Sequence, residues 1–230
     1  MPVLTLTKHH GLGNDFLVAL DQSVDGPMAR ALCDRHRGIG ADGLIGAFVD
    51  GTYVTFELYN CDGSRAEVSG NGLACLAQAV GRDRIEVRTD AGVRVVTLDL
   101  DRATVDMAAA TTKEMDGGLF VDMGNPHLVL RDEGQDLVAV GQQHLDLNVE
   151  LIAPASDGIR MRVHERGVGV TDACGSGACA SAVAAHTWGM AGERLTVHQD
   201  GGDAMVDLSG DSIRYTVPVG YIGRIEVPCP

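Results

Sequence analysis

Two alanine-rich apolar runs, one in each half of the chain, have the length and residue pattern of helices. The first covers residues 73–80 and stops at Gly81, and the second covers residues 178–188 and stops at Gly189. A glycine just after the last periodic position is a common helix end. The pattern therefore predicts two principal helices, and we expect each to be central and largely buried.

Other segments alternate between apolar and polar residues, which is the pattern of half-buried strands. These segments are residues 53–59, 93–100, 159–164, 195–198 and 213–217. Each half thus consists of strands, a glycine-rich turn, one principal helix and further strands. No regular alternation of strand and helix occurs, and no G-x-G-x-x-G fingerprint follows a strand, so we do not expect a nucleotide-binding doubly wound sheet.

The similar order of segments in the two halves predicts a duplicated fold of the α+β class. A polar, glycine-bearing segment at residues 108–118 follows the strand-like stretch 105–107 and suggests a boundary. We expect an N-terminal half at residues 1–107, joined by the C-terminal segment 218–230, and a C-terminal half at residues 108–217.

Composition excludes several classes of partner. A net charge of −14 argues against binding to nucleic acid or to an anionic membrane. The N-terminus lacks a signal peptide and no apolar run has membrane-spanning length, so we expect a cytoplasmic protein. The six cysteines form no C-x-x-C pair, and Cys174 and Cys179 are too isolated from histidine to suggest a zinc site, so we expect reduced thiols and no metal site.

Each predicted helix begins with a short glycine-rich stretch that can bind an anion. The two stretches are Ser69-Gly70-Asn71-Gly72 and Cys174-Gly175-Ser176-Gly177. Backbone amides and the positive end of the helix dipole at such a start would bind a carboxylate and lower the pKa of a thiol. One start holds a thiol, Cys174, and the other holds a hydroxyl, Ser69.

Polar clusters surround these two starts, and together they resemble a known family. The stretches Gly-Leu-Gly-Asn-Asp-Phe at 11–16, Asn60-x-Asp-Gly-Ser, Asp-Met-Gly-Asn-Pro-His at 122–127 and Asn148-Val-Glu150, together with the two glycine-rich starts, resemble diaminopimelate epimerase in order and across nearly the whole length. The resemblance implies two α/β halves, each a mixed sheet wrapped around a central helix, with the active site in the cleft between them. It also implies inversion at the α-carbon of a diamino diacid, on a route to lysine and peptidoglycan.

The resemblance also assigns roles to individual residues. Cys174 and Ser69 occupy the two catalytic positions, and His127 supports them. The remaining positions are expected to bind substrate: Asn14, Asn60, Gly70, Asn71, Asn125, Asn148, Glu165, Arg166, Gly175 and Ser176. We expect an amino acid as substrate, no cofactor and a homodimer; the only two lysines, Lys8 and Lys113, offer no recognisable pyridoxal phosphate setting.

Several positions depart from the family pattern, and Ser69 is the most consequential. Family members carry cysteine at the position of Ser69, usually arginine at Ala74 and usually glutamate at Val170, and they are longer. A hydroxyl is a far weaker acid than a thiol, so Ser69 cannot rest as an anionic base at neutral pH.

Three interpretations of Ser69 stay open on the sequence alone. In the first, the serine is an introduced substitution that inactivates the enzyme. In the second, it is a natural change that alters the substrate or the reaction. In the third, the protein has lost catalysis and kept the ability to bind its ligand. In the related proline racemase-like superfamily, some epimerases pair a serine with a cysteine, and a threonine with a cysteine goes with dehydration. The alternatives to a diaminopimelate epimerase are therefore a related epimerase or dehydratase and an amino-acid-binding protein.

Overall fold

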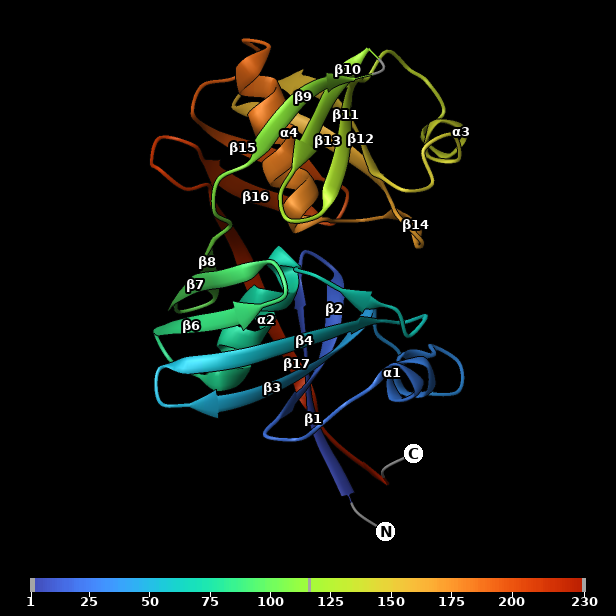
Figure 1. Cartoon of the computed structure of the whole chain (residues 1–230), viewed down its shortest axis with the longest axis vertical. Coiled ribbons are helices and arrows are strands. Elements are labelled where there is room, and N and C mark those ends of the chain that lie inside the picture. The colour runs from blue at the N-terminus through green and yellow to red at the C-terminus, as the bar shows by residue number, and fades with distance from the viewer. Residues whose placement is uncertain (1–2, 116, 229–230) are drawn as a thin grey trace. The chain divides into compact units, whose positions relative to one another are not determined.

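The computed structural model describes residues 3–115 and 117–228 and contains mostly strands (Figure 1). It divides into two compact units, one made of the chain up to Val105 and from Pro218 onward, the other of Asp106–Val217. The division falls inside a strand, two residues before the boundary expected from the sequence. Asp106 accepts hydrogen bonds from the Ala108 amide and the Ser212 hydroxyl, which tie it to the second unit.

In the first unit, strands surround helix α2 (Gly70–Val80), which packs against β1, β2, β3, β6 and β7 (Figure 1). A second, short helix, α1, begins after Asp25. The remaining elements are β1 (Val3–Gly11), β2 (Asn14–Leu20), α1 (Gly26–Cys33), β3 (Gly43–Asp50), β4 (Tyr53–Asn60), β5 (Arg65–Ala66), β6 (Arg84–Thr89), β7 (Gly92–Asp99) and β8 (Arg102–Asp106).

The strands of the first unit form a mixed sheet in the order β1-β2-β3-β4-β6-β7-β8. The pairs β2–β3 and β4–β6 are parallel and enclose α1 and α2 as crossovers, and the other neighbours are antiparallel. The final strand, β17 (Arg214–Pro228), pairs with β1 from Val219 to Pro228 and also pairs with β8. One late segment of the chain therefore joins both ends of the first sheet.

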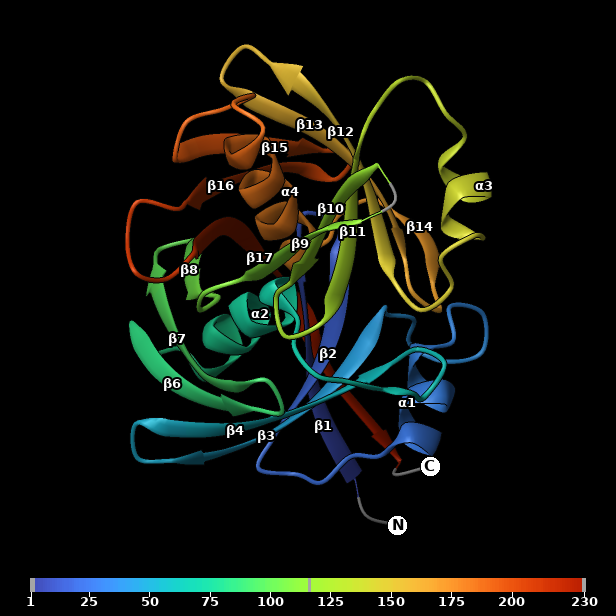
Figure 2. The ribbon, with the colours of Figure 1, turned by 45° about the horizontal axis from the view of Figure 1, so that its top comes forward.

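In the second unit, strands surround helix α4 (Gly175–Thr187), which packs against β10, β11, β12, β13, β15 and β16 (Figure 2). The remaining elements are β9 (Thr111–Met115), β10 (Gly118–Asp122), β11 (Pro126–Arg131), α3 (Leu137–Gly141), β12 (Asn148–Ala155), β13 (Gly158–Glu165), β14 (Gly169–Thr171), β15 (Arg194–Gln199) and β16 (Gly202–Asp207).

From β10 to β17, the order of pairing in the second unit repeats the order from β1 to β8 in the first, and β9 is an additional strand beside β10. The sheet runs β9-β10-β11-β12-β13-β15-β16, and β16 pairs with the first residues of β17. The parallel pairs are β11–β12 and β13–β15, and they enclose α3 and α4 as crossovers. Short strands β5 and β14 precede α2 and α4 at matching points.

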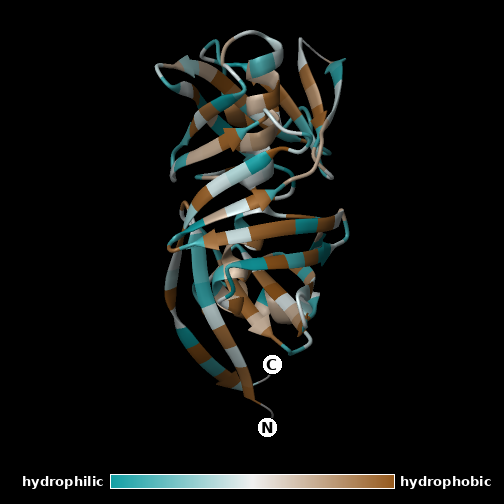
Figure 3. Ribbon diagram, turned by 90° about the vertical axis from the view of Figure 1, so that its left-hand side faces the viewer, coloured by the Kyte–Doolittle hydropathy of each residue, from teal (hydrophilic) through white to brown (hydrophobic). Residues whose placement is uncertain are grey.

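The predicted central helices are confirmed, and their composition explains how sheets close around them. The first eight residues of α2 are buried, as are ten of the thirteen residues of α4. Glycine, alanine, serine and cysteine dominate both buried stretches, so backbone strands can approach the helices closely on all sides. Along the strands, hydrophobic and hydrophilic residues alternate as the sequence pattern predicts (Figure 3).

Sequence reasoning missed the two short helices, α1 and α3, and the strands β1, β2, β3, β5, β6, β9, β10, β11, β12, β14 and β16. The segment 108–118, expected to be a polar boundary, contains strand β9. Helix α1 has a standard start, since the Asp25 carboxylate accepts a hydrogen bond from the Met28 amide and Pro27 occupies the first turn. Helix α3 is capped in the same way by Asp136.

Candidate active site

Ser69 and Cys174 occupy equivalent positions, each immediately before the central helix of its unit. Ser69 has φ −143° and ψ 122°, and Cys174 has φ −137° and ψ 118°. Each carbonyl accepts the first intrahelical hydrogen bond, from the amides of Leu73 and Ala178 respectively, at 2.9 Å. The two side chains thus begin from nearly the same backbone geometry.

The glycine three residues after each of these side chains provides the space that it needs. A Cβ on Gly72 would lie 3.1 Å from the Ser69 Cβ and 3.3 Å from its Oγ. A Cβ on Gly177 would lie 3.3 Å from the Cys174 Sγ and 2.7 Å from a carboxylate oxygen of Glu150. This crowding explains why a glycine follows at the same spacing in both helix starts.

The two side chains nevertheless make different contacts. The Ser69 Oγ accepts a hydrogen bond of 3.0 Å from the Gly72 amide, so it caps α2. The Cys174 side chain makes no capping hydrogen bond of this kind. Its Sγ lies 3.6 Å from the Ser176 Oγ, and its amide donates to the Gln199 side chain at 2.8 Å.

Burial sets the ionisation of Cys174, contrary to the expectation from the sequence. Only 6% of the residue is exposed, and burial raises the pKa of the thiol well above its ordinary value. The carboxylates of Glu165 and Glu150 raise this pKa further, and the Gly177 amide and Ser176 hydroxyl lower it by less. The helix start therefore does not outweigh desolvation and two nearby negative charges.

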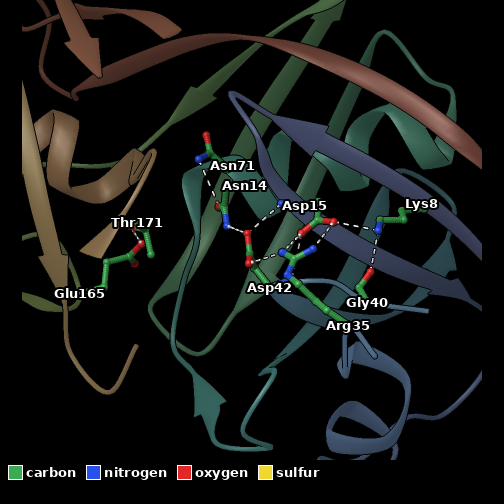
Figure 4. A network of polar contacts seen from close by, with 9 residues as sticks. All are labelled: Lys8, Asn14, Asp15, Arg35, Gly40, Asp42, Asn71, Glu165 and Thr171. Carbon is green, nitrogen blue, oxygen red and sulfur yellow. Dashed lines mark hydrogen bonds and ion pairs between the residues drawn. The ribbon is translucent and has the colours of Figure 1, made fainter. Parts of the chain in front are cut away.

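Glu165, at the end of β13, shares this environment. Burial raises the pKa of its carboxyl group, and hydrogen bonds from Thr171 and Cys174 act in the opposite direction. The Thr171 hydroxyl donates to Glu165 Oε1, and Figure 4 shows this pair. The Cys174 thiol and the Glu165 carboxyl group are thus in direct contact and compete for protons.

A buried pair on the neighbouring strands connects to the same helix start. His127 Nδ1 lies 2.6 Å from Glu150 Oε1, and neither side chain is exposed. His127 Nε2 lies 3.1 Å from Asn125 Oδ1, and the Asn125 amide nitrogen donates to Ser176 Oγ at 3.2 Å. The structure therefore brings together His127, Asn125, Ser176 and Cys174, all predicted site residues.

Asn148 and Arg166 are linked to each other. The Asn148 amide nitrogen donates to the Pro126 carbonyl at 2.9 Å, and its Oδ1 accepts from the Arg166 amide at 3.0 Å. Both polar ends of Asn148 are thus engaged with backbone, so it fixes the position of Arg166. The Arg166 residue itself is exposed.

In the first unit, Asn14 and Asn71 belong to a polar network shown in Figure 4. The Asn71 amide nitrogen donates to Asn14 Oδ1 at 3.2 Å, and the Asn14 amide nitrogen donates to Asp42 Oδ2 at 2.8 Å. Asn71 lies in the first turn of α2, so this network reaches the helix start that follows Ser69. Asn60 takes a different partner, the Ser64 hydroxyl of its own turn, at 3.0 Å.

Four charged residues that sequence reasoning missed complete this network. Arg35 Nη2 lies 2.8 Å from both Asp42 and Asp15, and Lys8 Nζ lies 2.8 Å from Asp15 Oδ2. Burial alone would raise the pKa of the Asp15 carboxyl, but hydrogen bonds from Arg35 and Lys8 outweigh it, and the pKa is lowered. Only the Gly-Leu-Gly-Asn-Asp motif, which contains Asp15, pointed to this region.

Two further observations concern metal binding and membrane-spanning helices. Within the described residues, no three histidine, cysteine or acidic side chains gather in a way that could hold a metal ion. Across the same part of the chain, no helix has both the length and the apolar character needed to cross a membrane.

Comparison with known proteins identifies close sequence relatives. The chain is 36% identical to the diaminopimelate epimerase of Synechocystis sp., over 92% of this chain and 93% of that protein. It is 37% identical to that of Pelotomaculum thermopropionicum, over 96% and 98% respectively. Each alignment contains more positions than this chain has residues, so these relatives carry segments that it lacks.

Solved structures with the same fold are more distant in sequence. A probable proline racemase from Agrobacterium radiobacter superposes with a TM-score of 0.79 at 15% identity, covering 99% of this chain and 93% of that one. A hydroxyproline epimerase from Agrobacterium vitis gives 0.74 at 14% identity, covering 98% and 92%. At these identities the match concerns the fold alone.

The family itself is shown by the sequence. A model described as diaminopimelate epimerase matches residues 6–113 and 119–222, which include both helix starts. Together with relatives above 35% identity over nearly the whole length, this match means that the chain belongs to the diaminopimelate epimerase family.

Proposed function

We propose that the protein is a cofactor-independent amino-acid epimerase that interconverts LL- and meso-diaminopimelate. The observation that carries the proposal is the matched pair of helix starts, with Ser69 and Cys174 in nearly the same backbone conformation. Family membership supplies the substrate. The proposal assigns to each start one of the two acid-base groups that inversion requires.

Inversion requires that a proton leaves one face of the α-carbon and another arrives at the opposite face. With Cys174 as thiolate, a new S–H bond forms while the electrons of the C–H bond pass toward the substrate carboxylate. The Ser69 hydroxyl delivers its proton to the other face and takes up a proton from solvent, so that no alkoxide remains. In the reverse direction, Ser69 accepts the substrate proton while its own hydroxyl proton passes to solvent, and the Cys174 thiol is the donor. Glu165, in contact with Cys174, accepts the thiol proton when the thiolate forms.

Backbone and side-chain donors meet the negative charge that develops on the carboxylate. The amides at Gly70, Asn71, Gly175 and Ser176 lie at helix N-termini, which favour anions, and they hold the reacting carboxylate. Asn14, Asn60, Asn125 and Arg166 bind the distal amine and carboxylate, and Asn148 contributes by fixing the Arg166 backbone.

We also propose the cellular setting that the family suggests. The protein acts in the cytoplasm as a homodimer, in the biosynthesis of lysine and peptidoglycan. Light scattering of the purified protein tests the dimer, and growth of a diaminopimelate auxotroph that carries this gene tests the pathway.

A second candidate function rests on the contact that Ser69 makes. Its Oγ caps α2, and serine is among the best capping residues, so a purely structural role accounts for it. In that case the protein binds its amino acid and exchanges a proton from the Cys174 face alone, or does not exchange at all.

Proton exchange separates these functions. LL-diaminopimelate is incubated with the protein in deuterated water, and NMR follows both loss of the α-proton and formation of the meso isomer. An epimerase gives both, and Cys174→Ala abolishes both. Binding without exchange at any pH contradicts the epimerase and supports the binding protein.

A further inference from the structure

Glu150 is a buried carboxyl group to which the proposed reaction gives no role. It lies on β12 with no exposed surface, and only Oε1 has a hydrogen-bond partner, His127 Nδ1 at 2.6 Å. Oε2 has none among the described residues. Burying a carboxyl group with one oxygen unpaired lowers the stability of the fold, so the presence of Glu150 here calls for a functional explanation.

An unbroken series of polar contacts connects Glu150 to Cys174. From Glu150 it passes through His127 to Asn125 at 3.1 Å, then to Ser176 at 3.2 Å, and ends at the Cys174 Sγ, 3.6 Å from the Ser176 hydroxyl. The four residues before Cys174 come from β12, from β11 and its preceding turn, and from the first turn of α4. The series therefore lies wholly within the second unit.

The chemistry of these groups fixes the direction of the hydrogen bonds. The Asn125 amide nitrogen donates to Ser176, so its carbonyl oxygen faces His127 and can only accept. His127 Nε2 must therefore carry a hydrogen. Glu150 permits this in two ways: as a carboxylate that accepts from a doubly protonated ring, or as a carboxylic acid that donates to a bare Nδ1. A neutral ring with its hydrogen on Nδ1 would leave Nε2 as an acceptor, which would reverse the direction of the hydrogen bonds from His127 to Ser176.

With this direction, the Ser176 oxygen accepts from Asn125 and its hydrogen remains available for the sulfur. We propose that Glu150 is a positioning residue that acts through His127 and Asn125 to orient the Ser176 hydroxyl as a donor to Cys174 Sγ. The consequence for catalysis rests on the proposed role of Cys174, but the orientation itself can be measured without turnover. A hydrogen bond to the sulfur stabilises the thiolate relative to the thiol.

Charge must be separated from orientation in any test. The titratable groups that act on Cys174 are Glu150 on β12 and Glu165 on β13, and His127 on β11 acts in turn on Glu165. The Glu150 charge opposes the thiolate, whereas the orientation that it imposes favours the thiolate. Removing Glu150 therefore has two effects of opposite sign.

Two uncharged replacements distinguish these effects. Glu150→Gln loses the charge but keeps a donor for His127 Nδ1, whereas Glu150→Leu loses both. Alkylation of Cys174 by iodoacetamide at neutral pH, followed by mass spectrometry, reports the thiolate fraction. The exposed Cys61 of the same molecule serves as the reference thiol.

We expect Cys174 to react roughly tenfold more slowly in Glu150→Leu than in Glu150→Gln, the effect of one hydrogen bond to a charged group. In a Ser176→Ala background the two variants should react at equal rates, because the donor is gone. Equal rates with Ser176 present, or a difference that persists without it, overturn the proposal. Neither outcome depends on epimerase activity.

A measurement on the unaltered protein covers the case in which Glu150→Leu does not fold. Nitrogen NMR of histidine-labelled protein, with His127 assigned through His127→Gln, shows whether Nε2 carries a hydrogen. A protonated Nε2 supports the proposal, and a bare Nε2 overturns it.

Discussion

Ser69 and Cys174 share a backbone conformation but differ in their side-chain contacts, and this difference makes Ser69→Cys informative. A thiol at position 69 would start from the geometry that Cys174 already adopts. We expect inversion of diaminopimelate to rise by roughly 10²–10⁴-fold, the usual effect of a positioned acid or base. Exchange from the Cys174 face should change far less.

Isomer-resolved NMR in deuterated water measures both rates for this variant. Ser69→Ala, which removes the hydroxyl without adding a thiol, is the matched control and should not gain inversion. If Ser69→Cys inverts no faster than the unaltered protein, Ser69 is not a disabled second base, and a specialised substrate becomes the better explanation.

The ionisation of Cys174 leads to a second prediction at this scale. Because burial and the charges of Glu165 and Glu150 raise the pKa of the thiol, alkylation of Cys174 should keep rising by roughly tenfold per pH unit through the neutral and mildly alkaline range. Glu165→Gln removes one opposing charge and should lower this pKa, so the rate at neutral pH increases. A rate that is already constant near neutral pH would contradict the raised pKa.

At the scale of elements, the first turn of α4 depends on the absence of a side chain at Gly177. A Cβ there would lie 2.7 Å from the Glu150 carboxylate. We expect Gly177→Ala to lower the free energy of unfolding by about 1–3 kcal/mol through overpacking, as urea denaturation would measure. Gly192, with nothing within 4 Å of its Cβ position, is the control, and its alanine variant should stay within about 0.5 kcal/mol.

The polar network of the first unit supports a second prediction of this kind. Lys8 is 15% exposed at its side chain and pairs with Asp15, which is 10% exposed. Lys8→Met leaves the Asp15 carboxylate with fewer partners in a buried site and should cost about 1–3 kcal/mol. The exposed Arg224–Glu226 pair is the matched case, and Arg224→Met should cost at most about 1 kcal/mol. Equal losses in the free energy of unfolding for the two variants would mean that burial does not strengthen the Lys8–Asp15 pair.

Sequence patterns predicted elements well where a single segment carries the signal. The alanine-rich runs gave both central helices, and alternation gave β4, β7, β13 and β15 to within about two residues. Strand β9 escaped prediction because its Thr-Thr-Lys-Glu-Met sequence is mostly exposed and has no apolar face. Its strand conformation comes from pairing with β10.

The site shows the same division between local and tertiary information. Motifs placed His127, Asn125 and Ser176 among the candidates because each lies in a recognisable stretch. The pairing of Glu150 with His127 joins strands β12 and β11, and Arg35, in the loop between α1 and β3, pairs with Asp15 on β2 and with Asp42 of its own loop. No local pattern in the sequence signals these contacts. Burial of Cys174 also depends on the surrounding sheet, and for this reason the pKa expected from the helix start alone was wrong.

At the scale of the whole molecule, the two units differ in how the chain supplies them. The second unit is continuous, Asp106–Val217, whereas the first also needs the chain from Pro218 onward. We expect residues 106–217 expressed alone to unfold cooperatively in urea, as followed by circular dichroism. Residues 1–105 alone should not, and adding a peptide of residues 218–230 should restore cooperative unfolding to them. A cooperative transition for residues 1–105 without the peptide would contradict this prediction.

The path of β17 has a consequence for co-translational folding on the ribosome. Its residues 219–228 pair with β1, so β1 gains this neighbour only after the chain has been translated through residue 228. The unit that is synthesised second can therefore be completed first. Until then the N-terminal strand has an open edge, and a nascent chain stalled before residue 219 would present that edge to chaperones or to other copies of itself.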